Sequence, residues 1–215
     1  MIRYTIDNID FNDFGVWVKE SAGVVDLPKP KEIKSTSWAE YHGSVVDLRN
    51  VRMEQRQITL SCYLKADNSA DFTAKILNFE KLLFGGLKRL QIDLTQDTSL
   101  FFDCYLSDEI LVKKKWSEAD MVGEFQIKLT EPEPQKKVLR FVATEAGKVF
   151  NITLSTLDAV QFSFGDGQTS GDVWGTDFEV EHEYSEAGEF FILIKGNIDN
   201  IHNITTNAEI IWEKL

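Results

Sequence analysis

The chain has 215 residues and a formal net charge of -12, and 43% of its residues are hydrophobic. This length allows one large domain or two modest ones, each with its own core, and the content of large apolar side chains excludes a disordered chain. Binding to a nucleic-acid backbone needs clustered Lys and Arg, and only Lys113-Lys114-Lys115 forms such a run. Specific nucleic-acid binding is therefore not expected.

The N-terminal stretch MIRYTIDNIDFNDFG shows no signal-peptide core, because acidic and polar residues interrupt every apolar pair. No apolar run approaches the roughly 20 residues needed to span a bilayer, so no membrane partner is expected. Cys62 and Cys104 each lie inside an alternating, strand-like run. For a chain that is not exported, we expect both to be reduced and buried.

Strand patterns prevail before residue 130. In RQITLSCYL the residues Ile58, Leu60, Cys62 and Leu64 alternate with polar ones, which predicts a half-buried strand. The same period of two returns in three later runs, KRLQIDL, LFFDCYL and GEFQIKL.

One segment, DFTAKILNFEKLLFGG, predicts an amphipathic helix instead. Its apolar stripe consists of Phe72, Ile76, Phe79 and Leu83. Asn68 or Ser69 is expected to be its N-cap, and the pair Gly85-Gly86 to end it. A stripe at this spacing is typical of a core-facing helix rather than a ligand site.

The fragment EPEPQKK, residues 131–137, has the composition of a linker, with two prolines, charges of both signs and no apolar residue. The charge balance changes close to it: residues 1–139 hold 19 basic and 22 acidic groups, whereas residues 140–215 hold 4 and 13. These two signals predict two domains, residues 1–133 and 138–215.

Short apolar runs follow the linker, separated by Gly, Asn and Asp clusters: VLRFV, VFNITLS, AVQFSF, DFEVEHEY, EFFILIKG and AEIIWEKL. A turn every ten or so residues is typical of a β-sandwich.

The sequence carries no recognisable catalytic or metal-binding motif. None of His42, His182 and His202 has another His or a Cys at zinc-ligand spacing. A nucleophile elbow, a phosphate loop and a dinucleotide-binding glycine motif are also missing. We therefore predict no enzyme, no catalytic residues, no cofactor and no metal site, and a hydrolase would lack an assembled nucleophile, base and orienting group.

Several single residues still allow a chemical interpretation. Asp166, Asp172 and Asp177 fall within twelve residues and could bind a hard cation, or be solvated loop carboxylates. His42, beside Glu40 and Tyr41, could be a general base or part of a polar turn at Gly43. We favour the structural interpretation in both cases.

The stretch FSFGDGQ, residues 162–168, presents Asp166 as metal ligand, catalytic acid or turn residue. Phe162 and Phe164 point to the same face of a strand, and Gly165 and Gly167 can supply the positive φ of a tight turn. A turn aspartate also accepts backbone N–H bonds. We therefore predict that Asp166 forms a corner.

With these elements placed, the first 130 residues resemble the N-terminal domain of phage distal tail proteins. The segments that carry the resemblance are FGVWV, VVDLPKPK, HGSVVDL, MEQRQITLSCYL, the single helix ending in LLFGG, and GEFQIKLTEPEP. The resemblance implies a tail-tube-like β-sandwich or split barrel with one flanking α-helix. It also implies a homo-oligomer, a hexameric ring between tail tube and baseplate hub, with DNA passing through its centre.

An acidic chain suits such a ring, because carboxylates lining a lumen repel the phosphate backbone and let DNA slide. The Lys113–Lys115 run would then contact an acidic neighbouring subunit, or be a solvated loop. The implied location is the virion tail, assembled in the bacterial cytoplasm.

The second half resembles the PKD-type immunoglobulin-like domain. FSFGDGQ followed by HEYSEAGEFFILI matches the corner and the later strand entry of that family, with Phe162 where Trp is usual and Phe190 where Tyr is common. Many distal tail proteins have a carbohydrate-binding-like second domain instead, so a receptor-binding role does not carry over. The sequence thus predicts a phage or prophage tail ring subunit with a peripheral immunoglobulin-like β-sandwich; the alternative is a cell-surface adhesin or carbohydrate-binding module.

Overall fold

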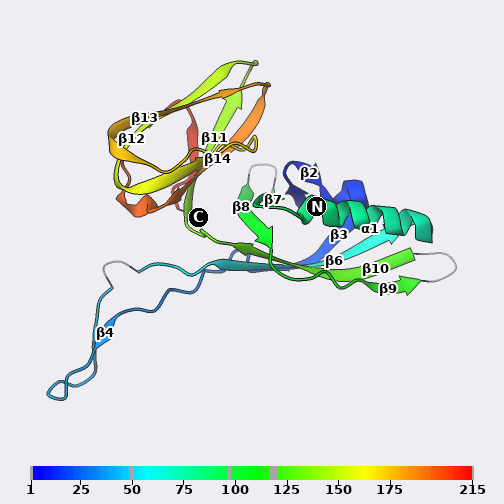
Figure 1. Ribbon diagram of the computed structural model, residues 1–215, viewed down its shortest axis with the longest axis horizontal. Helices are drawn as coiled ribbons and strands as arrows, with labels where there is room; N and C mark the ends of the chain where they lie inside the picture. The colour runs from blue at the N-terminus through cyan, green and yellow to red at the C-terminus, as the bar shows by residue number, and fades with distance from the viewer. Residues whose placement is uncertain (1, 49–50, 96–97, 117–120, 215) are drawn as a thin grey trace. The chain divides into compact units, whose positions relative to one another are not determined.

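The structure is a computed structural model and describes residues 2–48, 51–95, 98–116 and 121–214 (Figure 1). The chain divides into two compact units, Met1–Pro134 and Gln135–Leu215. Both are built from antiparallel strands, and the described residues contain one α-helix, which confirms the mainly β fold with one helix. None of the described helices has both the length and the apolar character required to cross a bilayer.

Unit 1 contains ten strands, one α-helix and one short 3-10 helix in the described residues. Their bounds are β1 (Arg3–Ile6), β2 (Ile9–Asp10), η1 (Phe11–Phe14), β3 (Val16–Ala22), β4 (Ser35–Thr36), β5 (Val45–Val46), β6 (Arg56–Ala66), α1 (Ser69–Leu83), β7 (Lys88–Asp93), β8 (Ser99–Leu106), β9 (Lys113–Trp116) and β10 (Met121–Glu131).

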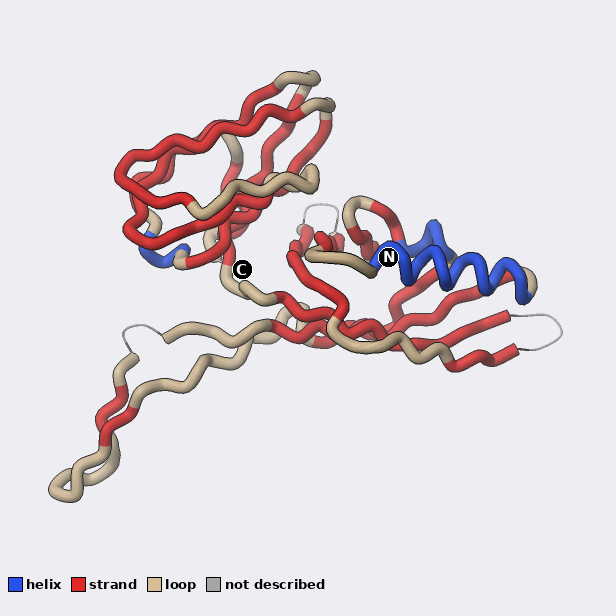
Figure 2. The backbone as a smooth tube through the Cα atoms, viewed as in Figure 1, coloured by secondary structure: helices blue, strands red, loops and turns tan. Residues whose placement is uncertain are grey.

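The main sheet of unit 1 has the strand order β2-β1-β7-β8-β10-β6-β3, and β9 adds to β10. Figure 2 draws the strands in red. Strand β8 joins the two halves of this sheet through only two residue pairs, Leu106–Leu129 and Tyr105–Thr130. The predicted strands are present, since Ile58, Leu60, Cys62 and Leu64 of β6 are all buried. Alternation therefore identified the core face correctly.

Helix α1 packs its apolar stripe on β6, β10 and η1. Phe72, Ile76, Phe79 and Leu83 are buried as predicted, and the ring of Phe79 meets Phe11 edge-on with centroids 5.0 Å apart. Each buried Phe contributes on the order of 1.5–3 kcal/mol. Asn68 caps the helix by accepting the N–H of Asp71 at 2.9 Å.

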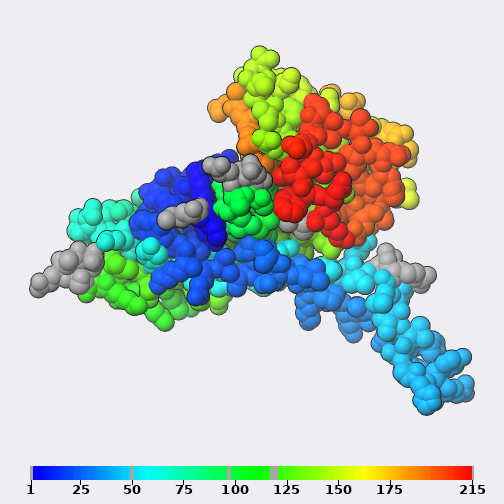
Figure 3. Space-filling model, turned by 180° about the vertical axis from the view of Figure 1, so that it is seen from behind, coloured from blue at the N-terminus to red at the C-terminus, as the bar shows by residue number. Residues whose placement is uncertain are grey.

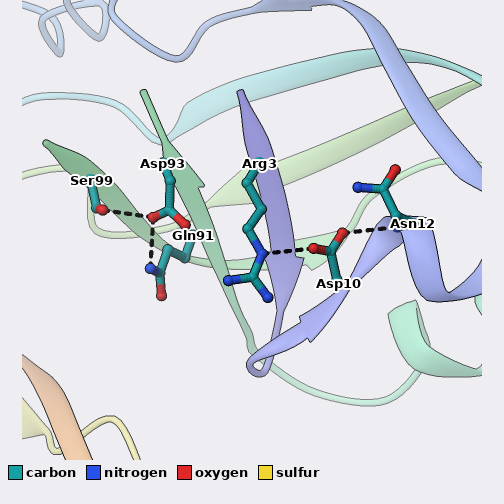
Figure 4. A network of polar contacts seen from close by, with 6 residues as sticks. All are labelled: Arg3, Asp10, Asn12, Gln91, Asp93 and Ser99. Carbon is teal, nitrogen blue, oxygen red and sulfur yellow. Dashed lines mark hydrogen bonds and ion pairs between the residues drawn. The ribbon is translucent and has the colours of Figure 1, made fainter. Parts of the chain in front are cut away.

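A polar network fixes the strands at the beginning of the chain (Figure 4). Asp10 accepts the backbone N–H of Asn12 at 2.9 Å, which caps η1, and it accepts a hydrogen bond from Arg3 Nε at 2.7 Å. This contact raises the pKa of Arg3 above its ordinary value. Strand β1 pairs with β7. On β7, Asp93 accepts one hydrogen bond from Gln91 of the same strand and one from Ser99 of β8. The ion pair thus links β1 to β2, and the Ser99 bond links β7 to β8.

Unit 2 contains six strands and one 3-10 helix in the described residues. Their bounds are β11 (Lys136–Ala143), β12 (Lys148–Ser163), β13 (Val173–Tyr184), β14 (Gly188–Gly196), η2 (Ile198–Asn200), β15 (His202–Thr206) and β16 (Glu209–Trp212). The strand order is β13-β12-β14-β11-β16, and β15 also pairs with β12. The strands enclose an aromatic core that includes Phe141, Phe150, Phe162, Phe164 and Tyr184.

Strand β12 corrects the sequence prediction, which treated VFNITLS and AVQFSF as separate runs. They form one strand of 16 residues that pairs with β13 and β15 in its first part and with β14 in its last part. Residues 156–158, which connect the two runs, include no Gly or Pro that would end the strand. The strand continues through them, and its pairing register with β13 shifts twice between Leu154 and Val160. Leu157 lies in this shift, 91% exposed. The prediction also missed β15.

Candidate interaction surface

The FSFGDGQ stretch forms a tight corner at the end of β12. Asp166 Oδ1 accepts the backbone N–H of Gln168 at 2.9 Å, and Gly165 and Gly167 have φ of 87° and 91°. A Cβ on Gly165 would lie 2.8 Å from the carbonyl oxygen of Phe191, so the chain passes too close there for any other residue. Asp166 therefore has the turn role that the sequence predicted.

The sequence did not predict that His182 would complete this corner. Its Nε2 lies 2.7 Å from Asp166 Oδ2, and its ring stacks on Phe164 with centroids 4.0 Å apart. Tyr184, two residues further along β13, donates its hydroxyl to the carbonyl of Phe164 at 2.8 Å. The histidine and the aspartate thus tie β13 to the corner.

The remaining acidic candidates lie apart. Asp172 accepts a hydrogen bond from Gln161 at 2.8 Å, and Asp177 accepts one from Ser155 at the same distance. Across the described residues, no group of three or more His, Cys, Asp or Glu side chains is arranged to hold a metal ion. Each aspartate has a local structural partner.

His42 lies exposed in the turn between β4 and β5, next to Gly43, whose φ is 83°. The Lys113–Lys115 run is a strand, β9, rather than the loop considered from the sequence. Lys115 contacts Glu124 at 2.5 Å, and Lys19 forms a second contact with the same carboxylate. These two cations, Lys115 foremost, lower the pKa of Glu124 to about 2.

The most unusual surface of unit 1 is the segment 24–55 between β3 and β6, which we call the arm (Figure 1). Its described residues from 34 to 48 are all exposed. Within the arm, β4 pairs with β5, and Pro30 forms an isolated bridge with Met53. A lone two-stranded hairpin is marginally stable in water. Nevertheless it carries several large apolar side chains with exposed fractions from 43% to 80%: Val25, Leu27, Trp38, Tyr41, Val45, Val46 and Leu48.

The root of the arm is fixed to the sheet by Arg56, the first residue of β6. Its guanidinium donates to the carbonyls of Val24 and Asp26 at 3.0 and 3.2 Å. It also forms a buried ion pair with Glu131 at 3.0 Å and lies over the ring of Phe102. Two backbone hydrogen bonds join the two sides of the arm near its root: the N–H of Lys31 donates to the carbonyl of Arg52, and the N–H of Glu54 donates to the carbonyl of Lys29. The arm therefore leaves unit 1 in a set direction, and Figure 3 shows it as a narrow extension.

A hollow of about 690 Å³ lies where α1 ends, lined by Leu83 to Leu87 and by Tyr105 to Asp108 of β8 and its following turn. Its rim is apolar: Phe84 is 79% exposed, Leu87 54% and Tyr105 37%. Helix α1 ends at Leu83, with Phe84 as an extended C-cap. Gly85 and Gly86 follow with φ of 89° and 80°, and a Cβ on either would meet only open space.

Sequence reasoning did not identify the arm or the hollow as surfaces. The arm segments VVDLPKPK and HGSVVDL entered the family resemblance, and within the arm only the turn at Gly43 was predicted as structure. In these segments apolar residues lie between charged residues and prolines and follow neither the strand period of two nor the helix period of 3.6. Such a pattern does not show which side chains are exposed to solvent.

No protein-family model and no curated protein matches the sequence. Among solved structures, the chain is similar to the Dit protein of phage SPP1, described as a paradigm of the hub adsorption apparatus in phages that infect Gram-positive bacteria. That match has 13% identity and a TM-score of 0.51 and covers 98% of this chain and 85% of the Dit chain.

Two further matches are chains of the phage p2 baseplate in its activated conformation, one with Sr and one with Ca. Their TM-scores are 0.44 and 0.42 at 9% and 10% identity, and each match covers 91% of this chain and 98% of the other. At these identities the comparisons concern the fold. The chain thus has a fold similar to that of a phage tail protein.

Proposed function

We propose that this chain is a structural component of a phage or prophage tail, a subunit of the ring that joins the tail tube to the baseplate hub. The observation that carries the proposal is the arm. It exposes seven large apolar side chains that a monomer gains nothing by displaying. The similarity to SPP1 Dit over 98% of the chain supports a tail role.

The partners in this proposal are further copies of the chain, in a hexameric ring, together with tail tube and hub proteins. An arm that contacts a different surface of the next copy makes a head-to-tail contact, which closes into a ring when the rotation permits. DNA would pass through the ring without specific contacts, as the net charge of -12 favours.

Unit 2 would be a peripheral PKD-type immunoglobulin-like domain, with domain limits of 1–133 and 138–215. The corner supports this assignment, because Asp166, His182 and Tyr184 join the two segments that carry the resemblance. The role is structural rather than enzymatic.

The test is the assembled state of the full chain. We expect negative-stain images and light scattering of concentrated protein to show six-membered rings. A variant with Trp38→Ser and Tyr41→Ser should stay monomeric at the same concentration, with unchanged thermal unfolding because both side chains are exposed in the monomer. A chain that stays monomeric alone and with the tail proteins of its own gene cluster would contradict the proposal.

A second candidate, glycan binding by unit 2, is favoured by Trp174. This side chain lies 63% exposed on β13, and exposed tryptophans are common at binding surfaces. A glycan array probed with the full chain and with Trp174→Ala would show reproducible binding that the substitution removes; equal signals from both proteins would eliminate this candidate.

A further inference from the structure

The side of unit 2 that carries Trp174 has an irregular backbone. Between the pairs Thr156–Gly175 and Val160–Val173, three residues of β12 lie opposite a single residue of β13, which is Trp174. On the other side of the first pair the excess is reversed, because two residues of β13 lie opposite one residue of β12. Trp174 therefore lies between two bulges. Bulges re-aim side chains and are frequent beside functional sites.

Specific contacts hold both bulges in place. In β13, Asp177 has a left-handed φ of 47°. Its backbone N–H donates to Ser155 Oγ at 2.9 Å, and Ser155 Oγ donates to Asp177 Oδ1 at 2.8 Å. In β12, Asp158 accepts hydrogen bonds from the side-chain amides of Asn197 and Asn200. Residues other than Gly rarely adopt a positive φ, and the surrounding structure has to hold them there. The fold itself therefore holds the tryptophan between the bulges in an outward position.

Two polar pairs accompany this ring along β13. Asp172, two residues before Trp174, accepts a hydrogen bond from Gln161 at 2.8 Å. Asp177, three residues after it, is bonded to Ser155. A carboxylate accepts at two oxygens and an amide both donates and accepts, so the pairs keep capacity for further hydrogen bonds. An exposed apolar ring thus has fixed hydrogen-bonding groups on both sides.

We propose that this surface binds a neutral saccharide. A sugar ring has apolar C–H groups on its faces and hydroxyls at its edges, so it stacks on an aromatic ring while polar side chains bind its hydroxyls. The inference rests on the second candidate function, glycan binding by unit 2, and deepens it by naming the ligand class and the binding residues. We call this surface the Trp174 face, and it consists of Ser155, Leu157, Gln161, Asp172, Trp174 and Asp177.

The apolar part of the Trp174 face is small for a protein interface. Leu157 is one of the three residues opposite the tryptophan, and it is exposed as well. A buried aromatic side chain contributes about 150–250 Å², so the two side chains together offer at most about 500 Å². Each partner in a stable protein interface contributes about 800 Å². A small ligand therefore fits this surface better than a protein does.

The charges around the face favour a neutral ligand. Asp172, Asp177 and Glu179 are all exposed on β13. The strand register places two basic residues beside the face, His202 of β15 and Lys195 of β14, and Lys195 is buried. Three exposed carboxylates repel sugars that carry carboxylate, sulfate or phosphate groups. Uncharged sugars are not subject to this repulsion.

The experiment probes the full chain on an array of neutral and anionic glycans, with the protein displayed in multivalent complexes so that weak single contacts are detected. We expect binding to neutral glycans. The affinity for the strongest of them is then measured by titration calorimetry. Trp174→Ala should lower it about tenfold or more, because the stacking surface is lost. The matched control is Trp38→Ala, which removes an exposed tryptophan from unit 1 and should leave the affinity unchanged.

A second pair of variants tests the polar groups. Gln161→Ala should lower the affinity for the same glycan about threefold or more, because it removes an amide that binds the sugar and positions Asp172. Gln168→Ala, exposed at the corner of the same unit, is its control and should bind as the unaltered chain does. Thermal unfolding of all four variants should match that of the unaltered chain, because the substituted side chains lie wholly or partly at the surface.

The outcomes separate this inference from the function on which it rests. Preferential binding of anionic glycans, or full affinity in Gln161→Ala, would overturn the inference and leave glycan binding at Trp174 standing. Equal affinity in Trp174→Ala, or no glycan bound at all, would overturn both. If no glycan binds and Trp174→Ala removes binding of a tail protein from the same gene cluster, the face is a protein surface and the saccharide is excluded.

Discussion

The corner at Asp166 allows a quantitative prediction, because its two glycines share a backbone conformation but differ in their surroundings. Gly165 and Gly167 both have φ near 90°, where an L residue is strained. A Cβ on Gly165 would lie 2.8 Å from the carbonyl oxygen of Phe191, whereas a Cβ on Gly167 would meet nothing within 4 Å. Phe191 lies in β14, paired with Arg140 of β11, so its backbone cannot move away freely.

These contacts set the expected order of two alanine variants. Gly167→Ala incurs the backbone strain alone, about 1–2 kcal/mol. Gly165→Ala incurs the same strain plus an overpacking cost of about 1–3 kcal/mol. In a domain of 60–100 residues, 1 kcal/mol lowers Tm by about 4–8 °C. We therefore expect Gly167→Ala to lower the Tm of unit 2 by roughly 4–16 °C, and Gly165→Ala to lower it substantially further.

The assay is scanning calorimetry of the full chain. The transition of unit 2 is identified with Phe150→Ala, which removes a fully buried ring from its core. Unit 1 should melt at the same temperature in all variants and is the internal control. Equal effects of the two alanine substitutions would refute the argument from the close approach to Phe191. An unchanged Tm for Gly167→Ala would refute the turn itself.

Three further substitutions or titrations test unit 1. Arg56→Ala should lower the stability of unit 1 by about 3 kcal/mol or more, measured by urea unfolding, because Glu131 then loses its buried ion pair; a change below 1 kcal/mol would contradict this role. Glu124 should titrate near pH 2 by NMR, and Lys115→Gln should raise that midpoint toward 4.5. Because the pKa of Glu124 is lowered in the folded state, its ionised carboxylate stabilises the fold at neutral pH, and this contribution is lost as the pH falls toward 2. Burial raises the pKa of Cys62 to about 12, so its thiol should resist maleimide at pH 8 and react only after unfolding; fast labelling of folded protein would show that it is accessible.

The sequence predicted those elements whose burial follows a simple period. The four apolar residues of β6 and the stripe of α1 were identified because one face of each element is buried and the other is not. The corner was predictable as well, since Gly165 and Gly167 specify positive φ locally. Its partner His182 was not, because the contact joins two strands whose register a sequence does not reveal.

The elements that the sequence did not predict were missed for a related reason. Strand β9 consists of three lysines followed by Trp116. An exposed edge strand of this kind has no alternation of apolar and polar residues from which a strand could be predicted. In β12 the shift at Leu157 has no Gly or Pro to mark it. The arm lacks a core face altogether, so period-based reasoning does not recognise it as structure, even though Val45 and Val46 pair with Thr36 and Ser35.

The same pairing carries an argument about assembly. Successive residues of a strand point to opposite faces, so Val45 and Val46 place apolar surface on both sides of the arm, and both are exposed. A hairpin that lies on a single surface would need only one apolar face. Covering both faces requires a partner on each side. The arm therefore presents apolar surface on both of its faces.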